Sequence, residues 1–374
     1  MNKNNIFFRN MMFILLSSIG GFLLSFTGLS IGWMIGSLVV ATLLSYRKPQ
    51  FLQTNEQGIS KFWTCIGQCL LGIELGQKIN LSVMSVFMEN SLAIIFMLIM
   101  SIIFSIISGY VLWKFSKTDM LTSFYGTAPG GLTAMPSIAE EVGANTAIVS
   151  IIQTIRVFLV ILMIPMIVSY LLVTPHHSGA ANSALMMAAP EFQFTQLFWT
   201  FALVFAAWGG AILGKKLKFP APWTIGSMLG VAIFQTAGSS MVGHDLIAWW
   251  PTTFMILAQI LIASSIGAMF HKNMLIGLGK IVNLALICTI GFILAMFGCS
   301  FIVSKLTEIT FVTATLAFAP GGIAEMATTS VLLDGDSTFV VAVQVLRIIV
   351  VLLFLPPCFK FIEHYEKKKV ELSG

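Results

Sequence analysis

The chain has 374 residues, of which 57% are hydrophobic and 9% are charged, and its formal net charge is +5. Soluble domains carry about 25% charged residues, so this composition excludes an ordinary soluble protein and indicates a polytopic membrane protein. The basic residues are spread over the loops, and no nucleic-acid-reading motif is present. We therefore expect the lipid bilayer, and no nucleic acid, as a partner.

Apolar segments follow one another along the whole chain. The first begins after Lys3 and Arg9 and continues past Gly20 and Gly21 without a small-residue cleavage site, so we expect a retained helix rather than a cleaved signal peptide. In chain order the segments are 11–27, 29–45, 60–78, 91–113, 119–140, 145–173, 195–214, 222–240, 251–271, 280–304, 310–333 and 337–362.

The third segment holds two of the five cysteines, Cys65 and Cys69, four residues apart on one helix face. No histidine or carboxylate joins them at the spacing of metal ligands. Free cysteines behave as small buried hydrophobic residues, and we prefer this interpretation to metal binding. We expect no metal and no cofactor, with Na⁺ or H⁺ as a coupling ion.

The fifth segment reads APGG at 128–131, and the eleventh repeats APGG at 319–322. A shift of 191 residues (320 − 129) superimposes the two prolines and, without a gap, a set of downstream residues. The further matches are Met135 with Met326, Gln153 with Gln344, Arg156 with Arg347 and Pro165 with Pro356. A tandem duplication is therefore predicted, with a first membrane repeat at 10–172, an extracytoplasmic linker at 173–199, a second repeat at 200–361 and a cytoplasmic tail at 362–374.

Loop charges predict that the two repeats are inverted. In the first repeat, Lys and Arg lie before segment one, between segments two and three, and after segment four. In the second repeat they lie between segments one and two, between segments three and four, and after the last. Because basic loops stay cytoplasmic, equivalent loops should lie on opposite sides of the membrane, with both termini cytoplasmic.

Inversion requires an odd number of crossings in each repeat, so one segment of each repeat should not cross. The segment with the Pro-Gly-Gly break is the natural candidate. The expected fold is an all-α polytopic membrane protein of two inverted repeats. Each has about five transmembrane helices plus one re-entrant Pro-Gly-Gly hairpin, which gives about 10–12 membrane segments in all. The main alternative is a broken spanning helix, with another segment failing to cross.

The two breaks are the first candidate binding elements. Glycine allows a sharp bend and close approach to bare backbone, and proline ends the incoming half-helix. Free N–H groups after the break suit an anion, whereas free carbonyl groups before it suit Na⁺ or a proton donor. A packing kink is the structural alternative. The candidate substrate-binding residues at the breaks are Pro129, Gly130, Gly131, Pro320, Gly321 and Gly322.

Buried charges provide the second set of candidates. Gln153 and Arg156, like Gln344 and Arg347, are three residues apart and share one helical face. A charge at the bilayer centre costs at least about 2.5 kcal/mol, so such residues face a cavity or a partner. We expect these four residues to bind an anionic substrate.

Two glutamates, Glu325 and Glu74, are the candidates for handling a coupling proton. Internal Arg–Glu pairs that fix helix packing are the alternative. The repeats differ here, because Ala134 and Ser265 occupy the equivalent positions.

The duplicated Pro-Gly-Gly-x-x-x-Met motif, followed by Gln-x-x-Arg and a late proline, resembles the membrane AbrB family over nearly the whole chain. Members carry labels such as ammonia monooxygenase or regulator of aidB expression. The resemblance implies that the Pro-Gly-Gly, Gln and Arg positions are family-typical, and the second repeat fits better because it has Glu325. It implies the bacterial plasma (inner) membrane as the location.

The preferred function is secondary transport of a small, anionic solute, with no enzymatic activity. A membrane-embedded regulator or sensor that affects gene expression indirectly is the alternative. A monooxygenase would need copper or iron with a His or carboxylate set, and the sequence has none. The partners expected are lipid and a small solute, and a homodimer is compatible with the sequence.

Overall fold

The computed structural model describes residues 3–26, 32–47, 59–77, 88–130, 134–172, 194–217, 219, 221–242, 249–270 and 278–373. Every regular element in this part of the chain is a helix. This confirms the predicted all-α class. Residues 173–193 of the predicted linker lie outside the described residues, and its last part, 194–199, is helical.

The chain divides into two compact units, each built from three separate stretches of sequence. Unit 1 comprises Met1–Met84, Pro165–Lys272 and Ile323–Thr338, and unit 2 comprises Ser85–Ile164, Asn273–Gly322 and Phe339–Gly374. Each unit therefore contains parts of both predicted repeats, and neither unit coincides with one repeat. The parts correspond except after the break, where 134–141 belongs to unit 2 and 323–332 to unit 1.

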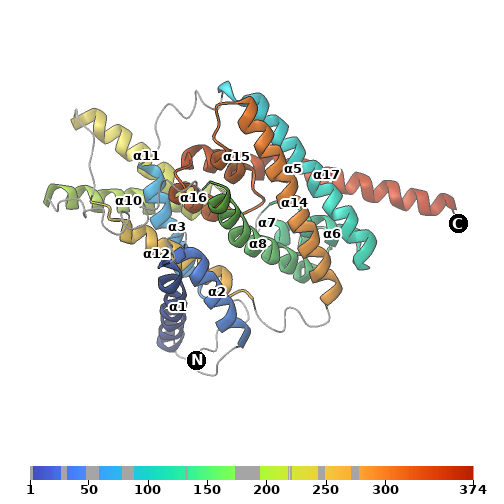
Figure 1. Cartoon of the computed structure of the whole chain (residues 1–374), viewed down its shortest axis with the longest axis horizontal. Coiled ribbons are helices and arrows are strands. Elements are labelled where there is room, and N and C mark those ends of the chain that lie inside the picture. The colour runs from blue at the N-terminus through green and yellow to red at the C-terminus, as the bar shows by residue number, and fades with distance from the viewer. Residues whose placement is uncertain are drawn as a thin grey trace. The chain divides into compact units, whose positions relative to one another are not determined.

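Unit 1 collects the first three helices of each predicted repeat and one short helix. These are α1 (Lys3–Ser25), α2 (Gly32–Arg47), α3 (Lys61–Gly76), α10 (Phe194–Lys216), α11 (Pro222–Val242), α12 (Thr252–Gly267) and α16 (Ile323–Leu332). Their packing is reciprocal: α1 packs on α2 as α10 packs on α11, and α2 packs on α12 as α11 packs on α3 (Figure 1). The duplication seen in the sequence is thus matched by a duplicated packing pattern.

Glycines allow the closest helix crossings in unit 1. Gly20 of α1 meets Gly36 of α2, and a Cβ on either would overlap the backbone carbonyl of the other. Gly210 of α10 and Gly226 of α11 meet in the same way. Small residues let helix backbones approach closely, which is how helices associate where lipid removes the hydrophobic driving force.

Unit 2 collects the later helices of both repeats. These are α5 (Ser91–Ser116), α6 (Met120–Thr127), α7 (Ala134–Glu141), α14 (Gly279–Leu306), α15 (Phe311–Phe318), most of α8 (Thr146–Leu172) and most of α17 (Ser337–Ser373). The long helices α5 and α14 pack on each other, α6 packs on α5, and α15 packs on α14 (Figure 1).

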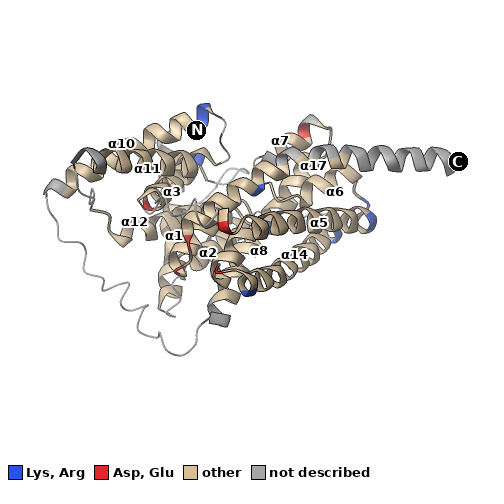
Figure 2. Ribbon diagram, turned by 90° about the horizontal axis from the view of Figure 1, so that it is seen from above, with Lys and Arg blue, Asp and Glu red and all other residues tan. Residues whose placement is uncertain are grey.

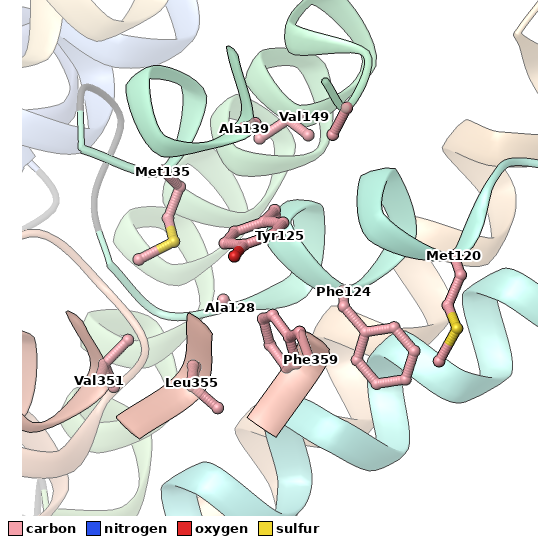
Figure 3. Close-up of a cluster of buried hydrophobic side chains, with 11 residues drawn as sticks. Met120, Phe124, Tyr125, Ala128, Met135, Ala139, Val149, Val351, Leu355 and Phe359 are labelled. Atoms are coloured by element: carbon pink, nitrogen blue, oxygen red, sulfur yellow. The ribbon is translucent and has the colours of Figure 1, made fainter. Parts of the chain in front are cut away.

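An aromatic cluster fixes α6 against the C-terminal helix α17 in unit 2. The ring of Phe359 lies 5.0 Å from that of Phe124 and 5.1 Å from that of Tyr125, centroid to centroid. Figure 3 shows the three rings together, with Met135 on the other side of Tyr125. Aromatic pairs at these separations add about 0.5–1.5 kcal/mol beyond the area they bury.

Five helices of the described part are long and apolar enough to cross a membrane, in the ranges Ile6–Ser25, Ser91–Ser116, Thr146–Val168, Gln196–Lys216 and Gly279–Leu306. Charged residues are sparse along the ribbon (Figure 2). Helices α2, α3 and α12 have 16 residues each, or about 24 Å, which is short of the roughly 30 Å hydrocarbon core. The first of the five lies within α1, which continues unbroken past Gly20 and Gly21.

Candidate binding site at two broken helices

Both Pro-Gly-Gly segments interrupt a helix, as predicted. In the first repeat α6 ends at Thr127 and α7 begins at Ala134, and in the second α15 ends at Phe318 and α16 begins at Ile323. Helices α6, α7 and α15 have eight residues each and α16 has ten. Eight residues rise about 12 Å, so no half-helix could cross a membrane alone.

The two incoming half-helices start and stop in the same way. The side chain of Asp119 caps α6 by accepting from the Thr122 N–H at 2.8 Å, and the side chain of Thr310 caps α15 by accepting from the Thr313 N–H at 3.3 Å. The caps are 191 residues apart (310 − 119), which is the repeat offset. These caps were not among the predicted site residues, although Asp or Thr before an apolar run is a recognisable signal.

At its C-terminal end each incoming half-helix is followed by an alanine with an extended backbone conformation. Ala128 has φ −66° and ψ 132°, and Ala319 has φ −56° and ψ 137°. The residue before a proline is pushed towards this extended conformation. The N–H of the glycine after the proline donates a hydrogen bond to the carbonyl of this alanine. The N–O distance is 2.9 Å for Gly130 and 2.8 Å for Gly321.

The carbonyl groups freed by the first break are bound by a glutamine. The Nε2 group of Gln153 in α8 donates to the carbonyls of Tyr125, Gly126 and Ala128 at 2.9, 3.0 and 2.8 Å. Gln153 is fully buried. Its amide therefore acts as a C-terminal cap for α6 that is supplied from a different helix.

Arg156 completes this cap with a positive charge. Its Nη1 donates to the carbonyls of Thr127 and Ala128 at 3.1 and 2.8 Å, and its Nη2 donates to Oε1 of Gln153. The C-terminal end of a helix carries a partial charge of about −0.5, so a guanidinium group is electrostatically favoured there.

The second repeat reproduces the arrangement. Nε2 of Gln344 in α17 donates to the carbonyls of Leu316 and Ala319 at 2.8 and 3.2 Å. Arg347 donates to the carbonyls of Phe318, Ala319 and Gly321 and to Oε1 of Gln344. Arg347 thus reaches beyond the proline to Gly321.

One donor of each arginine is left without a partner. Arg156 is 5% exposed and Arg347 is 1% exposed, and the Nε atom of each has no hydrogen-bond acceptor in the described structure. Unit 2 thus holds two buried like charges, each with a spare N–H.

A small cavity lies beside Arg156 between α5, α6, α8 and α14. Its volume is about 10 Å³, and its polar lining comes from Arg156, Ser108, Thr127, Cys288 and Thr289. This is close to the minimum space for one water molecule. The cavity is within unit 2 and lies next to the first break.

Comparison with known proteins assigns the chain to a family. The family model described as "Transition state regulatory protein AbrB" matches residues 33–363. The chain belongs to the AbrB family. It is 49% identical to the Bacillus subtilis (strain 168) "Uncharacterized protein YhjN" over 100% of this chain and 99% of that relative. It is 25% identical to the Escherichia coli (strain K12) "Putative regulator AbrB" over 81% of this chain and 83% of that relative.

The predicted Pro-Gly-Gly site residues of this AbrB-family chain differ in how far they are buried. Pro129, Gly130, Pro320 and Gly321 are buried and Gly322 is half-buried at the breaks, while Gly131 lies outside the described residues. Of these residues, Gly321 is bound directly, by Arg347. At the first break the described bonds of the Gln–Arg pair go to carbonyls at 125–128, just before Pro129.

The two glutamates belong to unit 1, whereas both arginines belong to unit 2. Glu74 is half-buried on α3, and Glu325 is 8% exposed in the first turn of α16. The hydrogen bonds described for Arg156 and Arg347 go to backbone carbonyls and to glutamine. Backbone capping is therefore an arginine role that the sequence analysis did not consider.

The cysteines of this AbrB-family chain are free thiols, and Cys65 and Cys69 are half-buried. Over the described ranges, no group of three His, Cys, Asp or Glu residues is placed to hold a metal ion.

Proposed function

We propose that this integral membrane protein is a secondary transporter of a small anion, with its binding site at the two broken helices. The observation that carries the proposal is that each break is capped by a buried Gln–Arg pair from the same repeat. Discontinuous helices in corresponding positions of two repeats are typical of transporter substrate sites.

The proposal includes inverted repeats and re-entrant hairpins. It is supported by half-helices of eight to ten residues, by the loop charges, and by the reciprocal packing in unit 1. In this topology α6 with α7 and α15 with α16 each enter and leave on one side. Both termini are then cytoplasmic in the bacterial inner membrane, and the linker is extracytoplasmic.

An anion is the favoured solute because of the charge balance in unit 2. Two guanidinium groups contribute +2, and the C-terminal ends of α6 and α15 offset about half of that, since each end carries about −0.5. An anion that accepts from the spare Nε–H groups of Arg156 and Arg347 would neutralise the remainder. Charge-assisted hydrogen bonds of this kind are shorter and about twice as strong as neutral ones.

A proton is the favoured coupling ion, with Glu325 and Glu74 as its carriers. Glu325 is buried in the first turn of α16, directly after the second break. Protonation of a buried carboxylate removes an isolated charge from an apolar setting, which makes such a group a suitable proton carrier. No enzymatic step is proposed.

A membrane-embedded regulator is the second candidate. It is favoured by the printed names of the family model and of the Escherichia coli relative. A stable cytosolic partner that copurifies with the protein and is released by a bound solute would favour this candidate over transport.

The test of transport uses purified protein in proteoliposomes with an imposed proton gradient. A panel of radiolabelled mono- and dicarboxylates and inorganic anions is offered, and we expect uptake of at least one. Uptake should be lost in Arg156→Gln and in Arg347→Gln, while Lys305→Ala, exposed at the end of α14, serves as the matched control. If no anion binds or moves under any gradient, the transport proposal fails.

A further inference from the structure

We propose that the guanidinium groups of Arg156 and Arg347 are resident cations, which fill the positions where half-helix ends of transporters bind Na⁺. The consequence is that the site binds its anion without Na⁺. The statement about solute binding rests on the proposed transport function. The statement that the arginines occupy the cation positions does not depend on transport.

The argument begins with the oxygen atoms around each guanidinium. Arg347 is surrounded by the carbonyl oxygens of Phe318, Ala319 and Gly321 and by Oε1 of Gln344. Backbone and amide carbonyls are the ligands that hard cations take in proteins. The C-terminal ends of half-helices coordinate Na⁺ in transporters with broken helices. A cation therefore belongs at this position, and the protein supplies its own.

Arg156 occupies the equivalent position at the first break. Its Nη groups donate to the carbonyls of Thr127 and Ala128 and to Oε1 of Gln153. Among the described residues, which leave out 131–133, three oxygens accept from Arg156 and four from Arg347. Arg347 is therefore the residue on which this position can be tested.

Burial and charge explain why a resident cation would exclude a mobile one. Both arginines are almost fully enclosed, and each guanidinium repels any other cation that comes close to it. A third positive charge next to them would meet that repulsion in surroundings that screen it poorly. The sequence alone suggested carbonyls open to Na⁺, but the structure has them hydrogen-bonded to arginine.

The test measures the melting temperature of the purified full chain in detergent, in buffers containing NaCl, choline chloride or ethylguanidinium chloride at equal ionic strength. We expect the wild-type protein and Lys305→Ala to melt at the same temperature in NaCl and choline chloride. Arg347→Ala exposes four oxygens without a cation, so it should melt several degrees lower in choline chloride and recover in NaCl and in ethylguanidinium chloride. Arg347→Lys retains a cation and should not respond to Na⁺.

Two results would overturn the proposal. One is a wild-type protein that NaCl stabilises over choline chloride. The other is an Arg347→Ala protein that is folded and melts at the same temperature in all three salts. If Arg347→Ala does not fold in any salt, the wild-type comparison decides alone. Because no solute is added, these results are independent of whether the protein transports an anion.

Discussion

The Gln–Arg pair shows how a charge can be kept in an apolar bundle. An arginine at the centre of a membrane helix costs about 2.5–3.5 kcal/mol on insertion scales. Each arginine here is the eleventh residue of its helix, counting from Thr146 in α8 and from Ser337 in α17. Each offsets its cost by binding carbonyls that proline and glycine have freed. The break and the arginine therefore stabilise each other, and neither is expected without the other.

The glutamine can be tested apart from the charge. Gln344→Leu removes the donor to the carbonyls of Leu316 and Ala319 and the acceptor for Arg347. A buried polar group left unpaired costs about 1–3 kcal/mol, so we expect a clear loss of thermal stability. Gln235→Leu in α11 is the control, since the Oε1 atom of Gln235 is already unpaired. Equal melting temperatures for the two variants would contradict the capping role.

At the scale of the element, the half-helices α6 and α15 depend on their caps because they are short. An isolated helix of eight residues is far below the length that is stable alone, so its ends decide whether it forms. Asp119→Ala removes the acceptor for the Thr122 N–H and should cost about 1 kcal/mol. Asp119→Asn keeps an acceptor and should cost less. Chemical denaturation of both variants measures the difference, and an equal loss in both would argue against a cap.

The glycine crossings of unit 1 offer a matched pair of neighbouring residues on α10. A Cβ on Gly210 would overlap the backbone of Gly226, whereas a Cβ on Gly209 meets nothing within 4 Å. Gly210→Ala should therefore destabilise by about 1–3 kcal/mol, the usual cost of overpacking. Gly209→Ala should be neutral or slightly stabilising because alanine favours helix. Melting temperature and the monodisperse fraction on gel filtration report both effects. Equal behaviour of the two variants would exclude a tight crossing.

The sequence predicted the breaks and the register of the repeats, because proline, glycine and a constant offset of 191 (320 − 129) are local or linear signals. It also placed Gln153 and Arg156 on one helix face. It could not predict that they bind carbonyls 25 to 29 positions away in the chain, since that depends on how α8 packs against α6. It gave no sign that α2 pairs with α12, because apolar helix faces do not specify their partners.

At the scale of the whole molecule, the two units differ in how their helices pack. Unit 2 holds three of the broken half-helices (α6, α7 and α15) and both arginines, and unit 1 holds the glycine crossings and α16. Each unit contains helices from both repeats, so neither can be completed by one repeat alone. Expression of residues 1–172 as a separate polypeptide should therefore give no folded protein. Coexpression with residues 173–374 should restore a complex that copurifies, whereas a stable, monodisperse 1–172 fragment would contradict this dependence.

Inversion of the repeats makes a prediction about the side of the membrane on which loops lie. Arg47 ends α2 and Lys216 ends α10. These basic helix ends differ in position within their repeats, yet both should be cytoplasmic. In a variant that lacks the five native cysteines, Arg47→Cys and Lys216→Cys should react with a membrane-impermeant maleimide only in inside-out vesicles. Ser183→Cys in the linker should react in intact cells. If Arg47→Cys and Lys216→Cys label from opposite sides, the repeats are parallel. The two half-helix pairs would then approach from the same face of the membrane.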